Sequence, residues 1–234
     1  PRKGWKLVSV DYSQVELRIL AHYSDDQILI KAFLENEDIH TRTAAEVFQS
    51  PPSSITTDLR RQAKAINFGI IYGMSAFGLS KQLGISQKMA KTYIDNYFAR
   101  YKGVKRFIDQ TLMEAHQTKM ASTLLGRIRL LPDIGSSNHN VRQAAERTAV
   151  NMPIQGTAAD LIKLAMIKVD EAIRDSKLET AMLLSVHDEL VFEVPPHELD
   201  TVTHLVKEIM EGIWDLKVPL MVNVAVGDNW TEAH

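Results

Sequence analysis

Strand-like sequence occurs near both ends of this chain, and a long series of helical segments lies between them. Residues 5–11 are typical of a strand, and residues 218–226 form a last strand-like run. Residues 181–194 show an alternating side-chain pattern and are rich in branched side chains. Alternation of this kind indicates strands, and the 181–194 segment indicates a hairpin. The pattern predicts an α+β fold in which both chain ends form an antiparallel sheet around a mainly helical insertion.

The segments between these strands carry hydrophobic residues at helical spacing. We expect helices at residues 15–23, 28–35, 38–48, 57–72, 86–100, 103–119, 142–150, 157–175 and 198–214. Residues 125–140 are rich in turn-forming side chains, and Pro153 is expected to break the helical sequence around it because proline lacks a backbone N–H.

Composition excludes several classes of protein. The 234 residues contain no cysteine, which rules out disulfides and thiolate metal sites, and this fits a cytoplasmic protein. No hydrophobic run approaches the roughly 20 residues of a membrane helix, so no membrane partner is expected. The net charge of −2 does not by itself favour nucleic-acid binding, although arginines can gather on one face while acidic residues surround a metal.

The first segment with chemical potential is Val-Asp-Tyr-Ser-Gln-Val-Glu-Leu-Arg at residues 10–18. Asp11 lies where the predicted strand gives way to a helix. A carboxylate at a strand end can reach a metal while the backbone stays rigid. An aspartate here can equally cap the helix that follows. The residues alone leave both interpretations open.

The second segment is the helix around residues 60–73. At about 100° per residue, Arg60, Lys64 and Phe68 fall on one face, with Tyr72 at its edge. Two cations followed by an aromatic ring suit a nucleotide, with phosphates against the cations and the base or sugar against the ring. A solvated basic helix is the alternative, and Ile71 falls on the same face without an assigned role. The hydrophobic side of the helix consists of Leu59, Ala63, Ile66 and Ile70.

The third segment is Ser-Val-His-Asp-Glu-Leu-Val-Phe at residues 185–192. Hydrophobic runs flank His187, Asp188 and Glu189, which predicts a hairpin with this trio at its tip. Two adjacent carboxylates on a rigid turn make a site for a hard cation. An ordinary polar turn and half of a histidine–aspartate hydrolase site are the alternatives.

Together the three segments resemble motifs A, B and C of the family A DNA polymerases, in the family's order. The resemblance extends to Gln-Gly-Thr-Ala-Ala-Asp at residues 155–160 and covers essentially the whole chain. Ile128 departs from it, because many relatives carry arginine there. The resemblance implies a palm at residues 1–20 and 146–234, with the motif C hairpin at 181–194. It implies helical fingers at residues 21–145, with the motif B helix at 57–73.

The activity that this resemblance implies is template-directed transfer of a deoxynucleotide to a primer 3′-hydroxyl, in DNA replication and repair. Two Mg²⁺ ions would bind to Asp11, to Asp188 and to the backbone carbonyl of Tyr12. Glu189 would support the catalytic site, and Lys64 would protonate the leaving pyrophosphate. The alternative is a non-catalytic module that binds nucleotide or DNA.

The resemblance also implies roles in substrate binding. The residues expected to bind the incoming deoxynucleoside triphosphate are Arg60, Lys64, His40, Gln14, Phe68, Glu16 and Tyr72. Among these, Glu16 and Tyr72 would together exclude a ribose 2′-hydroxyl. The residues expected to contact primer-template DNA are Arg147, Asn151, Gln155 and His187, with His187 near the primer terminus.

Thumb and exonuclease domains have no counterpart in these motifs. We therefore expect the chain to be a C-terminal piece of a longer polymerase, weakly active or inactive without the remaining domains. The expected location is the bacterial cytoplasm, in association with the nucleoid.

Overall fold

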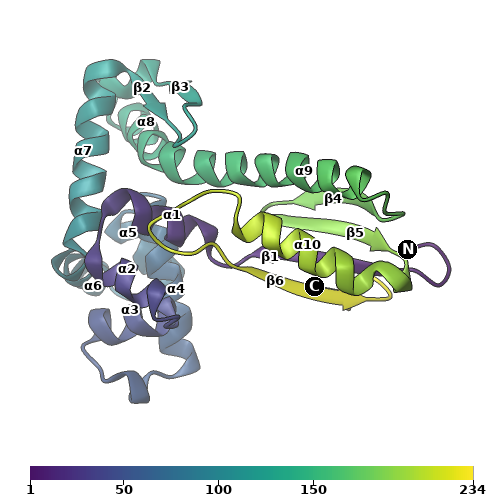
Figure 1. The fold of residues 1–234 in the computed structure, drawn as a ribbon. Helices are drawn as coiled ribbons and strands as arrows, with labels where there is room; N and C mark the ends of the chain where they lie inside the picture. The colour runs from purple at the N-terminus through teal and green to yellow at the C-terminus, as the bar shows by residue number, and fades with distance from the viewer. Residues whose placement is uncertain (234) are drawn as a thin grey trace. The chain divides into compact units, whose positions relative to one another are not determined.

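A computed structural model describes residues 1–233 and divides the chain into two compact units (Figure 1). The sheet unit consists of Pro1–Ile19 together with the residues from Thr157 onward, and the helical unit is Leu20–Gly156. The first boundary falls inside helix α1 (Val15–Ser24), and the second falls immediately before α9 (Thr157–Asp175). Among the described residues, no helix combines the length and hydrophobicity that a membrane crossing requires.

The sheet unit confirms the predicted α+β class and the antiparallel sheet. Its strands are β1 (Lys6–Tyr12), β4 (Ala181–Val186), β5 (Glu189–Val194) and β6 (Val222–Gly227). They lie in the order β4-β5-β1-β6, and each neighbouring pair is antiparallel. The strand from the N-terminal end therefore lies between two strands from the C-terminal end (Figure 1).

The core of this unit lies around β1 and β5. Every residue of β5 is buried, and Val8, Val10 and Phe192 have no exposed surface. Helix α10 (Leu199–Glu211) packs against β1, β6 and α9. The buried Tyr12 hydroxyl donates to the Met210 carbonyl oxygen at 2.7 Å, which ties β1 to this helix.

Apart from the 3-10 turn η4 (Pro196–Glu198) in the sheet unit and the π-helical turn η3 described below, the remaining helices lie in the helical unit. They are α2 (Gln27–Leu34), α3 (Ile39–Phe48), η1 (Pro52–Ser54), α4 (Thr57–Ile71), α5 (Ala76–Leu83), α6 (Gln87–Arg100), α7 (Lys102–Thr118), η2 (Pro132–Gly135) and α8 (His139–Asn151). Asp26, Asp38, Ser75, Ser86 and Asn138 cap helix N-termini through side-chain oxygens that accept backbone N–H groups. A short ribbon, β2 (Met120–Ser122) with β3 (Ile128–Leu130), completes the unit.

The helical elements and the short ribbon differ from the sequence prediction in several places. Pro153 separates α8 from α9 as expected, but the connection itself is helical, because a π-helical turn, η3 (Met152–Gly156), joins the two α-helices. The wider turn accommodates a residue that has no N–H to donate. Helix α5 was not predicted from its eight residues, and β3 lies within the stretch interpreted as turns. Ile128, Arg129 and Leu130 do alternate, but three residues are fewer than the four to eight over which alternation indicates a strand.

Candidate functional site

Two carboxylate-bearing segments meet in the sheet unit. Asp11, near the end of β1, is the register partner of Glu189, the first residue of β5. The Tyr12 backbone N–H donates to the carbonyl oxygen of Asp188 at 3.2 Å. Backbone pairing therefore places Asp11, Tyr12 and Asp188 on adjacent segments, at the end of β1 and the start of β5.

The hairpin tip is shorter than the sequence predicted. Its two connecting residues are His187 and Asp188, and His187 has a φ of 55°. A positive φ in a two-residue loop matches the turns that follow the strand twist. Glu189 was expected at the tip with them, and this is wrong, because it belongs to β5 and is buried.

Glu189 is held by hydrogen bonds that the sequence analysis did not predict. Its Oε1 atom accepts from the Ser9 hydroxyl at 2.5 Å and from the Trp230 indole N–H at 3.3 Å. Alternation along β1 places Ser9 on the same face as Asp11, which was the available signal in the sequence. No comparable signal identified Trp230, which lies far away in the chain.

The turn that joins β1 to α1 is also built from backbone contacts. Gln14 adopts a φ of 55°, and its carbonyl accepts the N–H groups of Leu17 and Arg18. Arg18 is buried and donates to the carbonyls of Ser13 at 2.8 Å and Pro219 at 2.6 Å. These bonds fix the start of α1, whose first turn contains Glu16.

The helical unit bears the predicted row of cations and rings on α4. Lys64 is exposed, whereas Arg60, Phe68 and Tyr72 are partly buried. The rings of Phe68 and Tyr72 stack with their centroids 6.1 Å apart and their planes 27° apart. Ile71, which the sequence placed on this face, is buried in the core, so it contributes packing.

His40 on α3 lies beside this row. Its ring centroid is 6.1 Å from that of Phe68, and only 3% of its surface is exposed. Burial lowers the pKa of His40 to about 4; Asp38 opposes this shift, while the positive charges of Arg60 and Lys64 add to it. The imidazole is therefore neutral at pH 7.

Asp38 connects α3 to the cations of α4. Its carboxylate accepts the backbone N–H of His40 at 3.0 Å and forms an ion pair with Arg60. Although partial burial raises the pKa of Asp38, hydrogen bonds from Arg60 and Thr41 outweigh it and lower the pKa. Asp38 thus positions the start of α3 and the guanidinium of Arg60 together.

Tyr72 and Arg147 line one cavity of about 520 Å³ in the helical unit. Gly73 also lines it, with a φ of 63°. A Cβ at Gly73 would lie 2.9 Å from Cγ of Arg147, so a larger residue would displace that side chain. The cavity therefore brings together one residue predicted for nucleotide binding and one predicted for DNA binding.

Asn151 and Gln155 lie four residues apart at the junction of α8 and the π-helical turn. Gln155 is exposed, and within residues 1–233 the buried Oδ1 of Asn151 has no hydrogen-bond partner. Buried polar atoms without partners are rare in folded proteins. Predicted relationships that join the two units, such as Glu16 with Tyr72, remain predictions.

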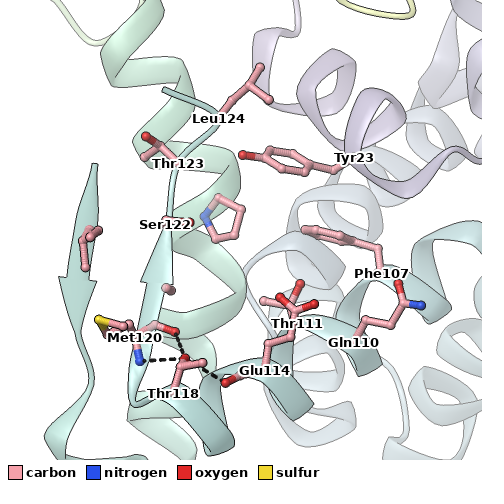
Figure 2. Close-up of a pocket in the computed structure, with 13 residues that line it drawn as sticks. Tyr23, Phe107, Gln110, Thr111, Glu114, Thr118, Met120, Ser122, Thr123 and Leu124 are labelled. Carbon is pink, nitrogen blue, oxygen red and sulfur yellow. Dashed lines mark hydrogen bonds between the residues drawn. The ribbon is translucent and has the colours of Figure 1, made fainter. Parts of the chain in front are cut away.

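Two further features lie outside the predicted residues. A cavity of about 640 Å³ lies in the helical unit, and the rings of Tyr23 and Phe107, which line it, stack with centroids 5.4 Å apart. Figure 2 shows the residues that line this cavity. Glu114 is the one charged residue among those that line it, so the cavity does not suit phosphate.

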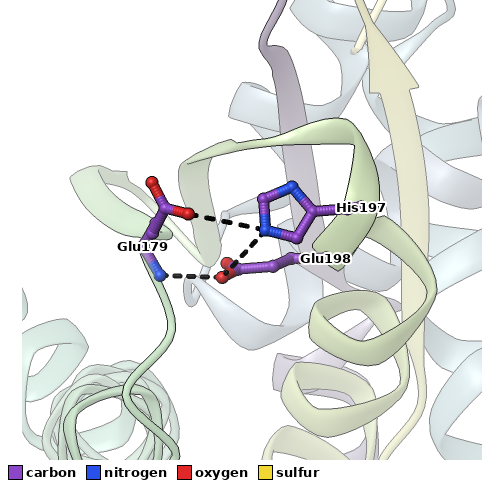
Figure 3. A group of neighbouring side chains, drawn as sticks. All are labelled: Glu179, His197 and Glu198. Carbon is purple, nitrogen blue, oxygen red and sulfur yellow. Dashed lines mark hydrogen bonds and ion pairs between the residues drawn. The ribbon is translucent and has the colours of Figure 1, made fainter.

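The second feature groups Glu179, His197 and Glu198 at the open end of the β4–β5 hairpin (Figure 3). The Glu198 carboxylate accepts the backbone N–H groups of Glu179 at 2.8 Å and Thr180 at 3.0 Å, and the Thr180 hydroxyl at 2.6 Å. These bonds anchor the segment that leads into β4. Asp188 lies at the opposite, closed end of the hairpin.

Comparison with known proteins gives consistent matches. Residues 1–232 match the sequence model of the family described as DNA polymerase family A. The chain is 50% identical over 232 residues to DNA polymerase I of Pseudomonas aeruginosa, which covers 99% of this chain and 25% of that protein. It is 53% identical over 228 residues to DNA polymerase I of Streptococcus pneumoniae, which covers 97% of this chain and 26% of that protein.

A solved structure is similar over the same length. It is the POL domain of Pol1 from M. smegmatis, in a complex with DNA primer-template and dNTP. The TM-score is 0.95 at 47% identity, and the match covers 99% of this chain and 41% of that one. The chain spans about a quarter of the length of the curated relatives described above.

Proposed function

We propose that this chain, which belongs to DNA polymerase family A, supplies the metal-binding and nucleotide-binding groups of a template-directed DNA polymerase that acts in replication and repair. The observation that carries the proposal is the pairing of β1 with the β4–β5 hairpin. That pairing brings Asp11 beside the segment of Asp188, although the two residues are far apart in the sequence. Family membership and this geometry point to the same reaction.

Polymerases of family A depend on metal ions. We assign two Mg²⁺ ions to the carboxylates of Asp11 and Asp188 and to the carbonyl oxygen of Tyr12. These are oxygen donors on paired backbone segments, which is the donor type that Mg²⁺ prefers. Bound ions of this kind activate the primer hydroxyl and neutralise charge on the transferred phosphate. Glu189, buried in β5, supports the site from within the sheet.

The face of α4 is the proposed binding surface for the deoxynucleoside triphosphate. Arg60 and Lys64 bind its phosphates, and Lys64 donates a proton to the leaving pyrophosphate. Phe68 packs near the sugar and base, and the partly buried Tyr72 stacks on Phe68. His40 and Gln14 assist at the phosphates, while Glu16 and Tyr72 exclude a ribose 2′-hydroxyl.

The proposed DNA contacts come from two places in the chain. Arg147, Asn151 and Gln155 read acceptors in the minor groove that correct base pairs share. The unpaired Oδ1 of Asn151 and the exposed side chain of Gln155 fit such a role. His187, exposed at the hairpin tip, lies near the primer terminus in this proposal.

The sheet unit corresponds to a palm and the helical unit to fingers. Residues 146–156, which the sequence analysis assigned to the palm, cluster with the helical unit. The partners are primer-template DNA, deoxynucleoside triphosphates and the remaining domains of the polymerase. A protein with these partners acts in the cytoplasm, at the nucleoid.

Primer extension tests the proposal. The polymerase that carries this chain is incubated with a primed template, deoxynucleoside triphosphates and Mg²⁺, and a primer with a dideoxy terminus is the control. We expect extension that requires both the metal and a free 3′-hydroxyl. Nucleotide binding without extension would instead identify a non-catalytic binding module. The same assay on the isolated 234 residues tests our expectation that they extend primers weakly or not at all.

A further inference from the structure

We propose that Asn67 is a positioning residue that holds His40 in the tautomer protonated at Nε2, so that this N–H remains the donor for the nucleotide's phosphates. The link to phosphate rests on the proposed function, whereas the tautomer itself does not. No role for Asn67 was predicted from the sequence. Its signal was an amide four residues after Ala63, on the hydrophobic side of α4.

The structural basis is a chain of buried hydrogen bonds within the helical unit. Asn67 Nδ2 lies 3.0 Å from His40 Nδ1, and the Thr43 hydroxyl donates to Asn67 Oδ1 at 3.1 Å. The Tyr101 hydroxyl lies 3.3 Å from Thr43 Oγ1. Asn67, Thr43 and Tyr101 have no exposed surface, and His40 is almost fully buried. This series of hydrogen bonds therefore connects Tyr101 to the imidazole of His40 entirely through buried groups.

The direction of donation along this chain follows from Tyr101. Within residues 1–233, the hydroxyl of Thr43 is the only hydrogen-bond partner of the Tyr101 hydroxyl. A buried phenol needs an acceptor for its proton, so Tyr101 donates to Thr43. The Thr43 hydroxyl then donates its own proton to Asn67 Oδ1, and the amide NH₂ of Asn67 therefore faces His40. With the amide reversed, Thr43 Oγ1 would accept from both Tyr101 and Asn67 Nδ2, and the buried Thr43 proton would have no acceptor among the described residues.

This direction determines the protonation of His40. A neutral imidazole carries one N–H and one lone pair, and Asn67 Nδ2 can only donate. Nδ1 therefore holds the lone pair and Nε2 holds the proton. The charged groups acting on the ring are Asp38, Arg60 and Lys64, and burial keeps the ring neutral at pH 7. Protonation of Nδ1 would require displacing the amide.

The tautomer of His40 determines whether its Nε2 atom can donate a hydrogen bond to a phosphate. Phosphate oxygens only accept hydrogen bonds, so a neutral imidazole assists them through its N–H alone. In the opposite tautomer, the Nε2 lone pair would face an anion and repel it. Asn67 thus affects nucleotide binding through His40, without contacting the nucleotide.

The first experiment measures the tautomer directly. The polymerase that carries this chain is labelled with ¹⁵N-histidine, and the two ring nitrogens of His40 are observed at pH 7. We expect Nε2 to be protonated and Nδ1 to be unprotonated. The matched variant is Asn67→Asp, because a carboxylate only accepts and should draw a proton onto Nδ1. The control is Asn96→Asp, a half-buried amide on α6 that donates to the Val47 carbonyl and should leave His40 unchanged.

The second experiment measures nucleotide incorporation by the same variants. We expect Asn67→Asp to raise KM for the deoxynucleotide about tenfold and to change kcat much less, because a hydrogen bond to a charged group is lost. In a His40→Gln background, exchanging Asn67 for Asp should have little further effect on KM, because its target is gone. If Asn67→Asp does not fold, Thr43→Val removes the orienting hydroxyl instead and should mix the two tautomers.

Three results would overturn the proposal. They are a wild-type His40 protonated at Nδ1, a tautomer unchanged by the replacement of Asn67 or Thr43, and a shifted tautomer with an unchanged KM. A polymerase with the expected tautomer but no primer extension would instead count against the proposed function and leave the tautomer assignment intact.

Discussion

The backbone N–H of Tyr12 donates to the carbonyl oxygen of Asp188 at 3.2 Å, so the end of β1 is bonded to the tip of the β4–β5 hairpin. One register position away, Asp11 is paired with Glu189. Two carboxylates at such a junction hold their relative position through backbone pairing, without depending on flexible side-chain contacts. This is the rigidity that a metal site requires.

Replacing either Asp11 or Asp188 with alanine should therefore abolish nucleotide transfer by the polymerase. We expect a loss of at least about a hundredfold, because each carboxylate is assigned to both metal ions. Steady-state primer extension at saturating Mg²⁺ measures the loss. Asp175→Ala, an exposed carboxylate at the end of α9, should retain full activity. Activity above a hundredth of wild type in Asp11→Ala or Asp188→Ala would refute the metal assignment.

Phe68→Tyr should make the polymerase accept dideoxynucleotides far more readily. The Phe68 ring centroid lies 6.1 Å from that of His40 and 6.1 Å from that of Tyr72. A phenol hydroxyl at this place would substitute for the missing 3′-hydroxyl of the nucleotide. The measurement is the ratio of dideoxy- to deoxynucleotide incorporation, with Phe48→Tyr on α3 as the control. An unchanged ratio would remove Phe68 from the nucleotide site.

Glu16→Ala should raise the ratio of ribonucleotide to deoxynucleotide incorporation. Glu16 lies in the first turn of α1, which the Arg18 hydrogen bonds hold in place. Shortening the side chain opens space for a 2′-hydroxyl, at the expense of a lower overall rate. Competition between the two nucleotide types measures the ratio. If the ratio does not rise, a different residue excludes the ribose.

The stability of the helical unit should fall as pH decreases from 6.5 to 4. Burial holds the pKa of His40 at about 4 in the folded chain, below its ordinary value of 6.5. The unfolded chain therefore binds more protons than the folded chain in this window. Above pH 6.5 His40 is neutral in both states, so it no longer lowers the free energy of unfolding. The slope from His40 is at most about 1.4 kcal/mol per pH unit.

Urea denaturation of the chain at several pH values, with His40→Gln for comparison, isolates this contribution from that of the carboxylates. A direct NMR titration of the His40 ring should give a midpoint near 4. A midpoint above 6, or identical pH profiles for the two proteins, would contradict the burial of a neutral imidazole.

Gly103→Ala should destabilise the helical unit by about 1–3 kcal/mol, because a methyl group would overpack a close backbone contact. A Cβ at this position would lie 2.7 Å from Cα of Asp26 and 2.8 Å from the Ser24 carbonyl oxygen. The Gly103 N–H also donates to the Asp26 carboxylate at 2.7 Å. Gly135→Ala is the control, since the nearest atom there is the mobile end of Lys119. Equal urea midpoints for the two variants would contradict this packing.

Local sequence determined the type of most elements and the identity of the chemical groups. Alternation predicted β1 and the hairpin, and helical periodicity predicted the face of α4 with Arg60, Lys64 and Phe68. These features were predictable because they depend on residues within a few positions of one another. The resemblance of three motifs to one family then supplied roles, which remain proposals for the individual residues.

Tertiary structure alone decided what depends on pairing between distant residues. The place of β1 between β5 and β6, and with it the pairing of Asp11 with Glu189, is set by strand register across the whole chain. The same holds for the buried side chains. Glu189 with Ser9 and Trp230, and Asn67 with His40, are hydrogen-bonded because other segments exclude water from them. A buried polar group requires a partner, and packing of the folded chain determines which partner is within reach.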